Sequence, residues 1–103
     1  MSLGEFYTPR WLAGLVLDGS GYDGDAGRRL CDPACGQGVF LELAIERARS
    51  RGAGLEQILS SIQGMEMNPL AAAAARQAYR AALGPLGAHL DPEQIPITCC
   101  DSL

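Results

Sequence analysis

Two glycines that closely follow an aspartate have the types and the spacing of a ligand-binding turn. Gly36 and Gly38 are separated by one residue, and Asp32 precedes them. A glycine lacks a Cβ, so it adopts positive φ without strain and lets a ligand approach bare main chain. Residues 28–31 before the turn have the pattern of a short strand, and residues 39–49 after it carry apolar side chains at helical spacing. A strand, a glycine turn and a helix in this order are typical of the opening of a nucleotide-binding α/β unit.

The chemistry of this turn narrows the class of ligand. A phosphate-binding Walker loop ends in Gly-Lys-Ser or Gly-Lys-Thr, and the chain contains no lysine. A dinucleotide fingerprint has a third glycine at the position where this chain has Leu41. Asp32 would repel a pyrophosphate, whereas its carboxylate suits a ligand that carries an ammonium group. S-adenosylmethionine has an ammonium and a sulfonium and no phosphate, so these residues favour it.

Four segments of the chain resemble the motifs of one enzyme family. The string from Asp32 to Phe40, Asp-Pro-Ala-Cys-Gly-Gln-Gly-Val-Phe, resembles the first motif of the N6-adenine DNA methyltransferases. Residues 4–9 resemble the segment before that motif in type I modification subunits and fused restriction–modification enzymes. Residues 64–69 resemble the second motif, and residues 101–103 resemble the third. The matches follow the family's order, so the chain is identified as a member of this family, as its N-terminal cofactor-binding fragment.

The resemblance implies a site for S-adenosylmethionine at the carboxyl ends of three strands. Glu66 ends the second strand, where a carboxylate can accept two hydrogen bonds from the ribose hydroxyls, although a lone acid there is otherwise a cap or a surface group. By resemblance, Met67 packs against the adenine ring, Asp101 accepts a hydrogen bond from the adenine amine, and the arm around Thr8 folds over the methionine end. The expected cofactor-binding residues are Tyr7, Thr8, Pro9, Asp32, Pro33, Ala34, Cys35, Gly36, Gly38, Phe40, Glu66, Met67, Asp101 and Ser102.

These motifs require an α/β architecture that brings three strand ends together. We expect a partial Rossmann-like methyltransferase fold, with three parallel strands in the order 3-2-1, flanking helices, and an N-terminal arm and helix. Residues 1–17 form the arm and helix, and residues 28–103 form a cofactor-binding βαβαβ half. The expected elements are helices over 9–17, 39–49, 55–61 and 70–83 and strands over 28–31, 61–67 and 95–100.

The first helix carries the most detailed expectation. Thr8 is expected to be its N-cap and Pro9 its first residue, because proline has a suitable φ and needs no N–H there. We place Leu12, Leu15 and Val16 on its buried face.

Later elements carry three further expectations. Asn68 should cap the alanine-rich helix, with proline in the next position. If the second strand is regular, Met65 and Met67 share the face opposite Glu66. The arginines at positions 47–51 suit a helix C-terminus, and a basic patch for DNA is the less favoured alternative.

Composition excludes several classes of function. The chain has 103 residues, of which 48% are hydrophobic, and these are ordinary values for one small soluble domain. Its formal net charge of −4 argues against binding of a nucleic-acid backbone by these residues alone. It has no apolar run of the roughly 20 residues that a membrane span needs. The four cysteines do not have the spacing of a zinc site, so we expect no metal, reduced thiols and a cytoplasmic location.

The catalytic motif of the family is missing from these residues. By resemblance it reads Asn-Pro-Pro followed by an aromatic residue, and it holds the flipped adenine; the chain contains no Pro-Pro. We therefore expect a truncated domain that has no catalytic residue and does not methylate by itself, from a parent that binds DNA through regions missing here. The open edge of the first strand is expected to permit self-association. The alternatives are the cofactor half of a protein or RNA methyltransferase, or a non-catalytic binding module.

Overall fold

The computed structural model of the chain describes residues 9–22, 24, 30–32 and 38–99. Helices and strands alternate along the sequence, as the predicted βαβαβ pattern requires. The described elements are α1 (Arg10–Ser20), β1 (Leu30–Asp32), α2 (Val39–Ser50), α3 (Leu55–Ser61), β2 (Ile62–Glu66), α4 (Pro69–Leu83), the 3-10 helices η1 (Gly84–Gly87) and η2 (Pro92–Gln94), and β3 (Ile97–Cys99).

The expected three parallel strands in one sheet are confirmed. The strands lie in the order β1-β2-β3, which is the predicted order 3-2-1 counted from the other edge. Asp32 of β1 pairs with Gly64 of β2, and Glu66 pairs with Cys99 of β3. The register therefore places Glu66 two residues, or about 7 Å along the strand, beyond the level of Asp32.

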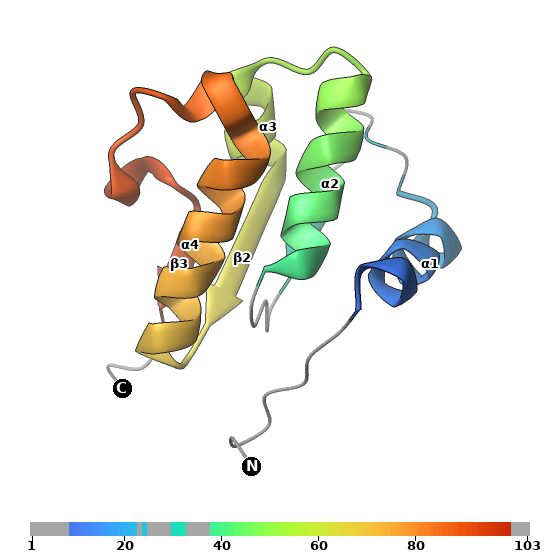
Figure 1. Cartoon of the computed structure of the whole chain (residues 1–103), viewed down its shortest axis with the longest axis horizontal. Helices are drawn as coiled ribbons and strands as arrows, with labels where there is room; N and C mark the ends of the chain where they lie inside the picture. The colour runs from blue at the N-terminus through green and yellow to red at the C-terminus, as the bar shows by residue number, and fades with distance from the viewer. Residues whose placement is uncertain (1–8, 23, 25–29, 33–37, 100–103) are drawn as a thin grey trace.

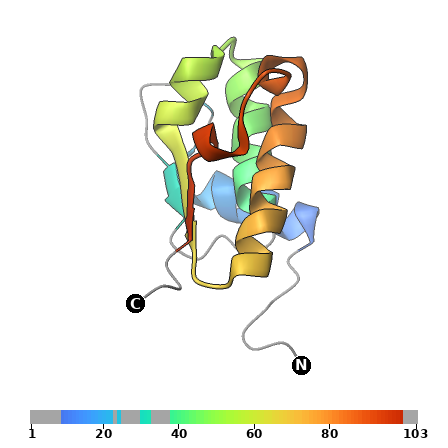
Figure 2. The ribbon, with the colours of Figure 1, turned by 90° about the vertical axis from the view of Figure 1, so that its left-hand side faces the viewer.

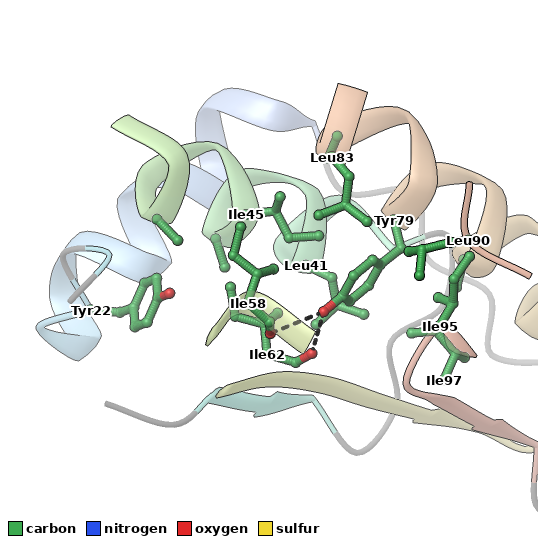
Figure 3. Close-up of a cluster of buried hydrophobic side chains, with 14 of the residues drawn as sticks. Tyr22, Leu41, Ile45, Ile58, Ile62, Tyr79, Leu83, Leu90, Ile95 and Ile97 are labelled. Atoms are coloured by element: carbon green, nitrogen blue, oxygen red, sulfur yellow. Dashed lines mark hydrogen bonds between the residues drawn. The ribbon is translucent and has the colours of Figure 1, made fainter. Parts of the chain in front are cut away.

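The helices α1, α2 and α4 form a layer on one face of the sheet. Figure 1 shows α2 between α1 and α4, and Figures 2 and 3 show the strands on one side of these helices. The side chains of β2 alternate accordingly: Ile62 and Gly64 are buried, whereas Gln63 and Met65 are exposed. Because side chains alternate between the two faces of a strand, this pattern shows that, among the described residues, one face of β2 is covered and the other is exposed.

The core lies between this helix layer and the sheet (Figure 3). Its largest fully buried side chains are Tyr79, Leu41, Ile45, Ile58, Ile62 and Leu83. The Tyr79 hydroxyl donates to two main-chain carbonyls, those of Ile58 at 3.2 Å and Ile62 at 2.7 Å. Burial raises the pKa of Tyr79, so this hydroxyl stays protonated and links α4 to the middle of α3 and the start of β2.

The predicted bounds of the first helix were wrong at both ends. The helix begins at Arg10, and Pro9 is the N-cap residue with extended backbone (φ −61°, ψ 149°). It continues three residues past Leu17, and Gly21 then ends the helix with φ 84°. In this last turn Ser20 Oγ donates to the Leu17 carbonyl. A glycine in this left-handed conformation is a common helix terminator, so the stop signal was Gly21.

The predicted buried face of the first helix was also wrong. Ala13 and Leu17 are the buried residues of α1, whereas Leu12, Leu15 and Val16 are exposed. On this side α1 also forms three ion pairs with α2. These join Arg10 to Glu46 at 2.8 Å, Arg10 to Glu42, and Asp18 to Arg47 at 2.8 Å.

α3 has the predicted bounds, and the other bounds that fall on described residues differ from the predicted ones by at most two residues. The predicted strand positions 28, 29 and 100 lie outside the described residues. The second strand ends at Glu66, so Met67 lies outside it. The prediction that Met65 and Met67 share a strand face was therefore wrong, because the chain turns toward α4 directly after Glu66. Among the described residues, no helix is long and apolar enough to cross a membrane.

Candidate functional site

The carboxyl ends of the strands and the first turns of two helices meet at one edge of the sheet. The arrowhead of β2 and the N-termini of α2 and α4 lie at the same end of the molecule in Figure 1. This geometry follows from the connections, since α2 comes after β1 and α4 comes directly after β2. Ligands of open α/β sheets bind at such an edge. Helix N-termini there carry unpaired N–H groups and a partial positive charge.

Glu66 is held at the junction between β2 and α4. Its side chain is half-buried, and Oε2 accepts a hydrogen bond from the Asn68 main-chain N–H at 3.1 Å. Asn68 in turn accepts hydrogen bonds at Oδ1 from the N–H groups of Leu70 at 2.9 Å and Ala71 at 3.3 Å. The predicted Asn68 cap with Pro69 in the next position is thus confirmed. A carboxylate fixed in this way is pre-oriented at the strand end, where a diol could be bound.

Two large apolar side chains are exposed beside Glu66 in the sequence. Met67 is 65% exposed and Leu70, in the first turn of α4, is 82% exposed. Exposed apolar side chains at a strand end suit a flat ligand such as an aromatic ring. The sequence analysis singled out Met67 and missed Leu70, although an apolar residue directly after an Asn-Pro cap was a usable signal.

Gly38 has the left-handed backbone that the glycine turn predicts. Its φ is 83°, and it is the N-cap residue of α2. A Cβ built at this position would lie 3.2 Å from the Ala75 Cα and 3.3 Å from the Ala78 Cβ of α4. The missing side chain therefore permits α2 to approach α4 closely. That packing role differs from the predicted exposure of main chain to a ligand, which stays a prediction.

Phe40 and Pro9 have structural roles that sequence reasoning did not assign. Phe40 is partly buried and packs against the hydrophobic core from the first turn of α2. Pro9 precedes α1, and its carbonyl accepts the first helical hydrogen bonds from Leu12 and Ala13. Neither contact tests a role in cofactor binding.

The end of β3 is joined to the loop after Glu66 by a thiol. Cys99 Sγ lies 3.8 Å from the Met67 carbonyl, the distance of a weak S–H hydrogen bond. Cys31 is a free cysteine. Within residues 9–22, 24, 30–32 and 38–99, no group of three or more His, Cys, Asp or Glu side chains could hold a metal ion.

Several expected site residues lie outside the described part of the chain. They are Tyr7, Thr8, Pro33, Ala34, Cys35, Gly36, Asp101 and Ser102. Asp32 is described as the last residue of β1 by its backbone alone. The structure thus brings Asp32, Gly38, Phe40, Glu66 and Met67 to one edge, and their predicted contacts with a cofactor stay predictions.

The fold is that of an α/β domain with a parallel sheet, and the carboxyl-terminal edge of this sheet is the candidate site. The sequence pattern of the family described as N-6 DNA Methylase matches residues 1–78, and the chain therefore belongs to that family. The type I restriction enzyme MjaIX methylase subunit of Methanocaldococcus jannaschii is 37% identical over 68 residues. The match covers 66% of this chain and 11% of that relative. No solved structure matches the chain.

Proposed function

We propose that this chain is the S-adenosylmethionine-binding part of a DNA adenine-N6 methyltransferase of a restriction–modification system. The observation that carries the proposal is the Glu66 carboxylate, fixed by the Asn68 N–H at the end of the central strand. Membership of the N-6 DNA Methylase family supports DNA as the substrate over RNA or protein. We further propose that residues 1–103 are the N-terminal part of a Rossmann-like methyltransferase domain located in the cytoplasm.

The residues at the sheet edge fit the chemistry of this cofactor. Glu66 would accept hydrogen bonds from both ribose hydroxyls, because a carboxylate offers two acceptor oxygens in one plane. Met67 would cover the adenine ring, and Asp101 with Ser102 would bind its amine edge. Further contacts would come from the turn and the arm, namely from Tyr7, Thr8, Pro9, Asp32, Pro33, Ala34, Cys35, Gly36, Gly38 and Phe40. When bound, S-adenosylmethionine supplies an electrophilic methyl group.

We propose that the 103-residue chain by itself binds cofactor without methylating DNA. Its only Asn-Pro string is Asn68-Pro69, followed by Leu70 in place of a second proline. The Asn68 side chain already accepts two main-chain hydrogen bonds at the start of α4. It therefore serves as a helix cap and is not available to hold an adenine amine. DNA would be bound by regions of a longer protein that this chain does not include.

Replacing Glu66 by glutamine tests the proposed site. Glutamine keeps an oxygen that can accept the Asn68 N–H, but it loses the negative charge and one acceptor oxygen. We expect the affinity of the chain for S-adenosylmethionine, measured by calorimetry, to fall about 10- to 100-fold, as for loss of a hydrogen bond to a charged group. Glu56→Gln is the matched control, because Glu56 is exposed in α3, which precedes β2. Unchanged affinity in Glu66→Gln, or a wild-type chain that binds no cofactor, would contradict the proposal.

We also propose that isolated chains associate through the outer edge of β1. β1 is an edge strand with an exposed Cys31, and it pairs only with β2 among the described residues. Unpaired main-chain groups on such an edge can pair with another chain, and a lysine on the edge opposes this. Light scattering under reducing conditions should show association that Cys31→Lys abolishes. Thr98→Lys, an exposed position on β3, should leave it unchanged. A wild-type chain that stays monomeric in this measurement would refute this interface.

A further inference from the structure

Two arginines one turn apart on α4 bind the segment that returns to the sheet. Arg76 Nη2 donates to the Ile97 carbonyl at 3.0 Å, and Arg80 Nη2 donates to the Leu90 carbonyl. Both side chains are half-buried, and both acceptor residues are buried. Positions four residues apart on a helix lie on the same face, so the two arginines extend from the same face of α4. They differ in what they hold, because Leu90 is in a loop and Ile97 is in β3.

The Ile97 carbonyl points away from the rest of the sheet. Gly64 N–H of β2 donates to the Pro96 carbonyl at 3.0 Å. Successive residues of a strand direct their main-chain groups to alternate sides, so Ile97 presents its N–H and carbonyl to the outer side of β3. Its N–H donates to the Ile95 carbonyl at 2.7 Å, and its carbonyl accepts from Arg76. Both outward groups of Ile97 are thereby satisfied without another strand.

Arg76 completes a closed path of contacts around Glu66. From Glu66 the path runs through the Asn68 cap into α4, then across Arg76 to Ile97 and along β3 to Cys99. Cys99 pairs with Glu66 in the sheet register and contacts the Met67 carbonyl. β3 has only three residues, so it forms few hydrogen bonds with β2, and these bonds alone fix its position weakly. A charge-assisted bond from a rigid helix is stronger than a neutral one and fixes the strand.

We propose that Arg76 is a positioning residue of the cofactor site. Its guanidinium holds β3 in register with β2, so that the end of β3 at Cys99 stays beside Glu66. This inference rests on the proposed function, because the site that Arg76 positions is the proposed site for S-adenosylmethionine. The role itself is geometric: Arg76 touches no reacting atom and acts through the end of β3.

The test compares Arg76→Met with Arg80→Met in the full 103-residue chain. Each variant keeps a long apolar stem and removes one guanidinium bond to a main-chain carbonyl, so the two are matched in chemistry. In Arg76→Met we expect the Gly64 amide hydrogen, which bonds to Pro96 across the strands, to exchange about tenfold faster with solvent, and cofactor affinity to fall about tenfold. Arg80→Met should leave both unchanged even if the melting temperature falls, and Arg76→Lys should restore part of both.

The outcomes separate this inference from the proposed function. If Arg76→Met and Arg80→Met change Gly64 exchange and cofactor affinity equally, or if neither changes them, Arg76 is not a positioning residue. If the wild-type chain binds no S-adenosylmethionine, the proposed function fails, while the exchange comparison still decides whether Arg76 sets the register of β3.

Discussion

The helices α1 and α4 both pack beside α2, but they are held in opposite ways. α4 turns small and aromatic side chains inward, and Ala72, Ala75 and Tyr79 are fully buried against the core. α1 buries Ala13 and Leu17 and leaves Trp11 68% exposed. Near its two ends, Arg10 and Asp18 add ion pairs with α2.

This difference in burial shows that, among the described residues, α4 is the more deeply packed of the two helices. Buried apolar packing is worth more than exposed ion pairs, which contribute about 0–1 kcal/mol each. The pairs of α1 are partly exposed; the Asp18 side chain retains 64% of its accessibility beside Arg47. Arg47 adds hydrogen bonds to the carbonyls of Tyr22 at 2.9 Å and Gly14 at 3.2 Å, which fix α1 more firmly than the ion pair alone. We expect α1 to open before α4 when the fold is stressed.

The largest effect is expected where α2 meets α4. Gly38→Ala should lower the free energy of unfolding by about 3 kcal/mol, because alanine is strained at positive φ and its Cβ would press on Ala75 and Ala78. Urea denaturation followed by circular dichroism measures the change.

Gly52→Ala separates the two causes. Gly52 has nearly the same φ, 85°, but a Cβ there would meet nothing within 4 Å. Its substitution should show the backbone strain alone, about 1–2 kcal/mol. Equal losses in the two variants would mean that close packing at Gly38 contributes nothing.

An intermediate effect is expected at the buried face of α1. Leu17→Ala should lower the free energy of unfolding by about 2 kcal/mol, because Leu17 is buried in the hydrophobic core and its loss leaves a cavity. The value lies at the low end for a buried leucine, since α1 is at the margin of the core. Denaturation under the same conditions as for Gly38→Ala allows a direct comparison.

The smallest effect is expected two residues earlier on the same helix. Leu15 is 59% exposed, so Leu15→Ala should change the free energy of unfolding by less than about 0.5 kcal/mol. If Leu15→Ala destabilised the chain as much as Leu17→Ala, the originally predicted buried face of α1 would be the correct one.

Sequence reasoning succeeded where local chemistry leaves one choice. Asn68 followed by proline and a run of alanines forms a capped helix in almost any context, because the cap, the fixed proline φ and the alanine propensity all agree. The glycine of the turn likewise predicted the positive φ of Gly38. The order of apolar segments predicted three parallel strands, since each crossover contains a helix.

It failed where one helix had two candidate faces. Six of the eleven residues of α1 are Trp, Ala, Leu or Val, so hydrophobicity alone does not decide which side is buried. The ion partners of α1, namely Glu42, Glu46 and Arg47, are more than 20 residues away in the sequence. The arginines show the same limit. Arg47 and Arg49 lie in the last turn of α2, as predicted, but the sequence did not indicate that they also donate to the carbonyls of Gly14, Tyr22 and Ala82.

The sequence by itself determined the family, the parallel α/β order and the strand-end position of Glu66, because these follow from short motifs and from the period of apolar residues. Only the tertiary structure decided what the polar groups around that position bind. Hydrogen bonds such as that from Arg76 to Ile97 join residues far apart in the chain. Their geometry depends on how the helix layer lies on the sheet, which no local pattern contains.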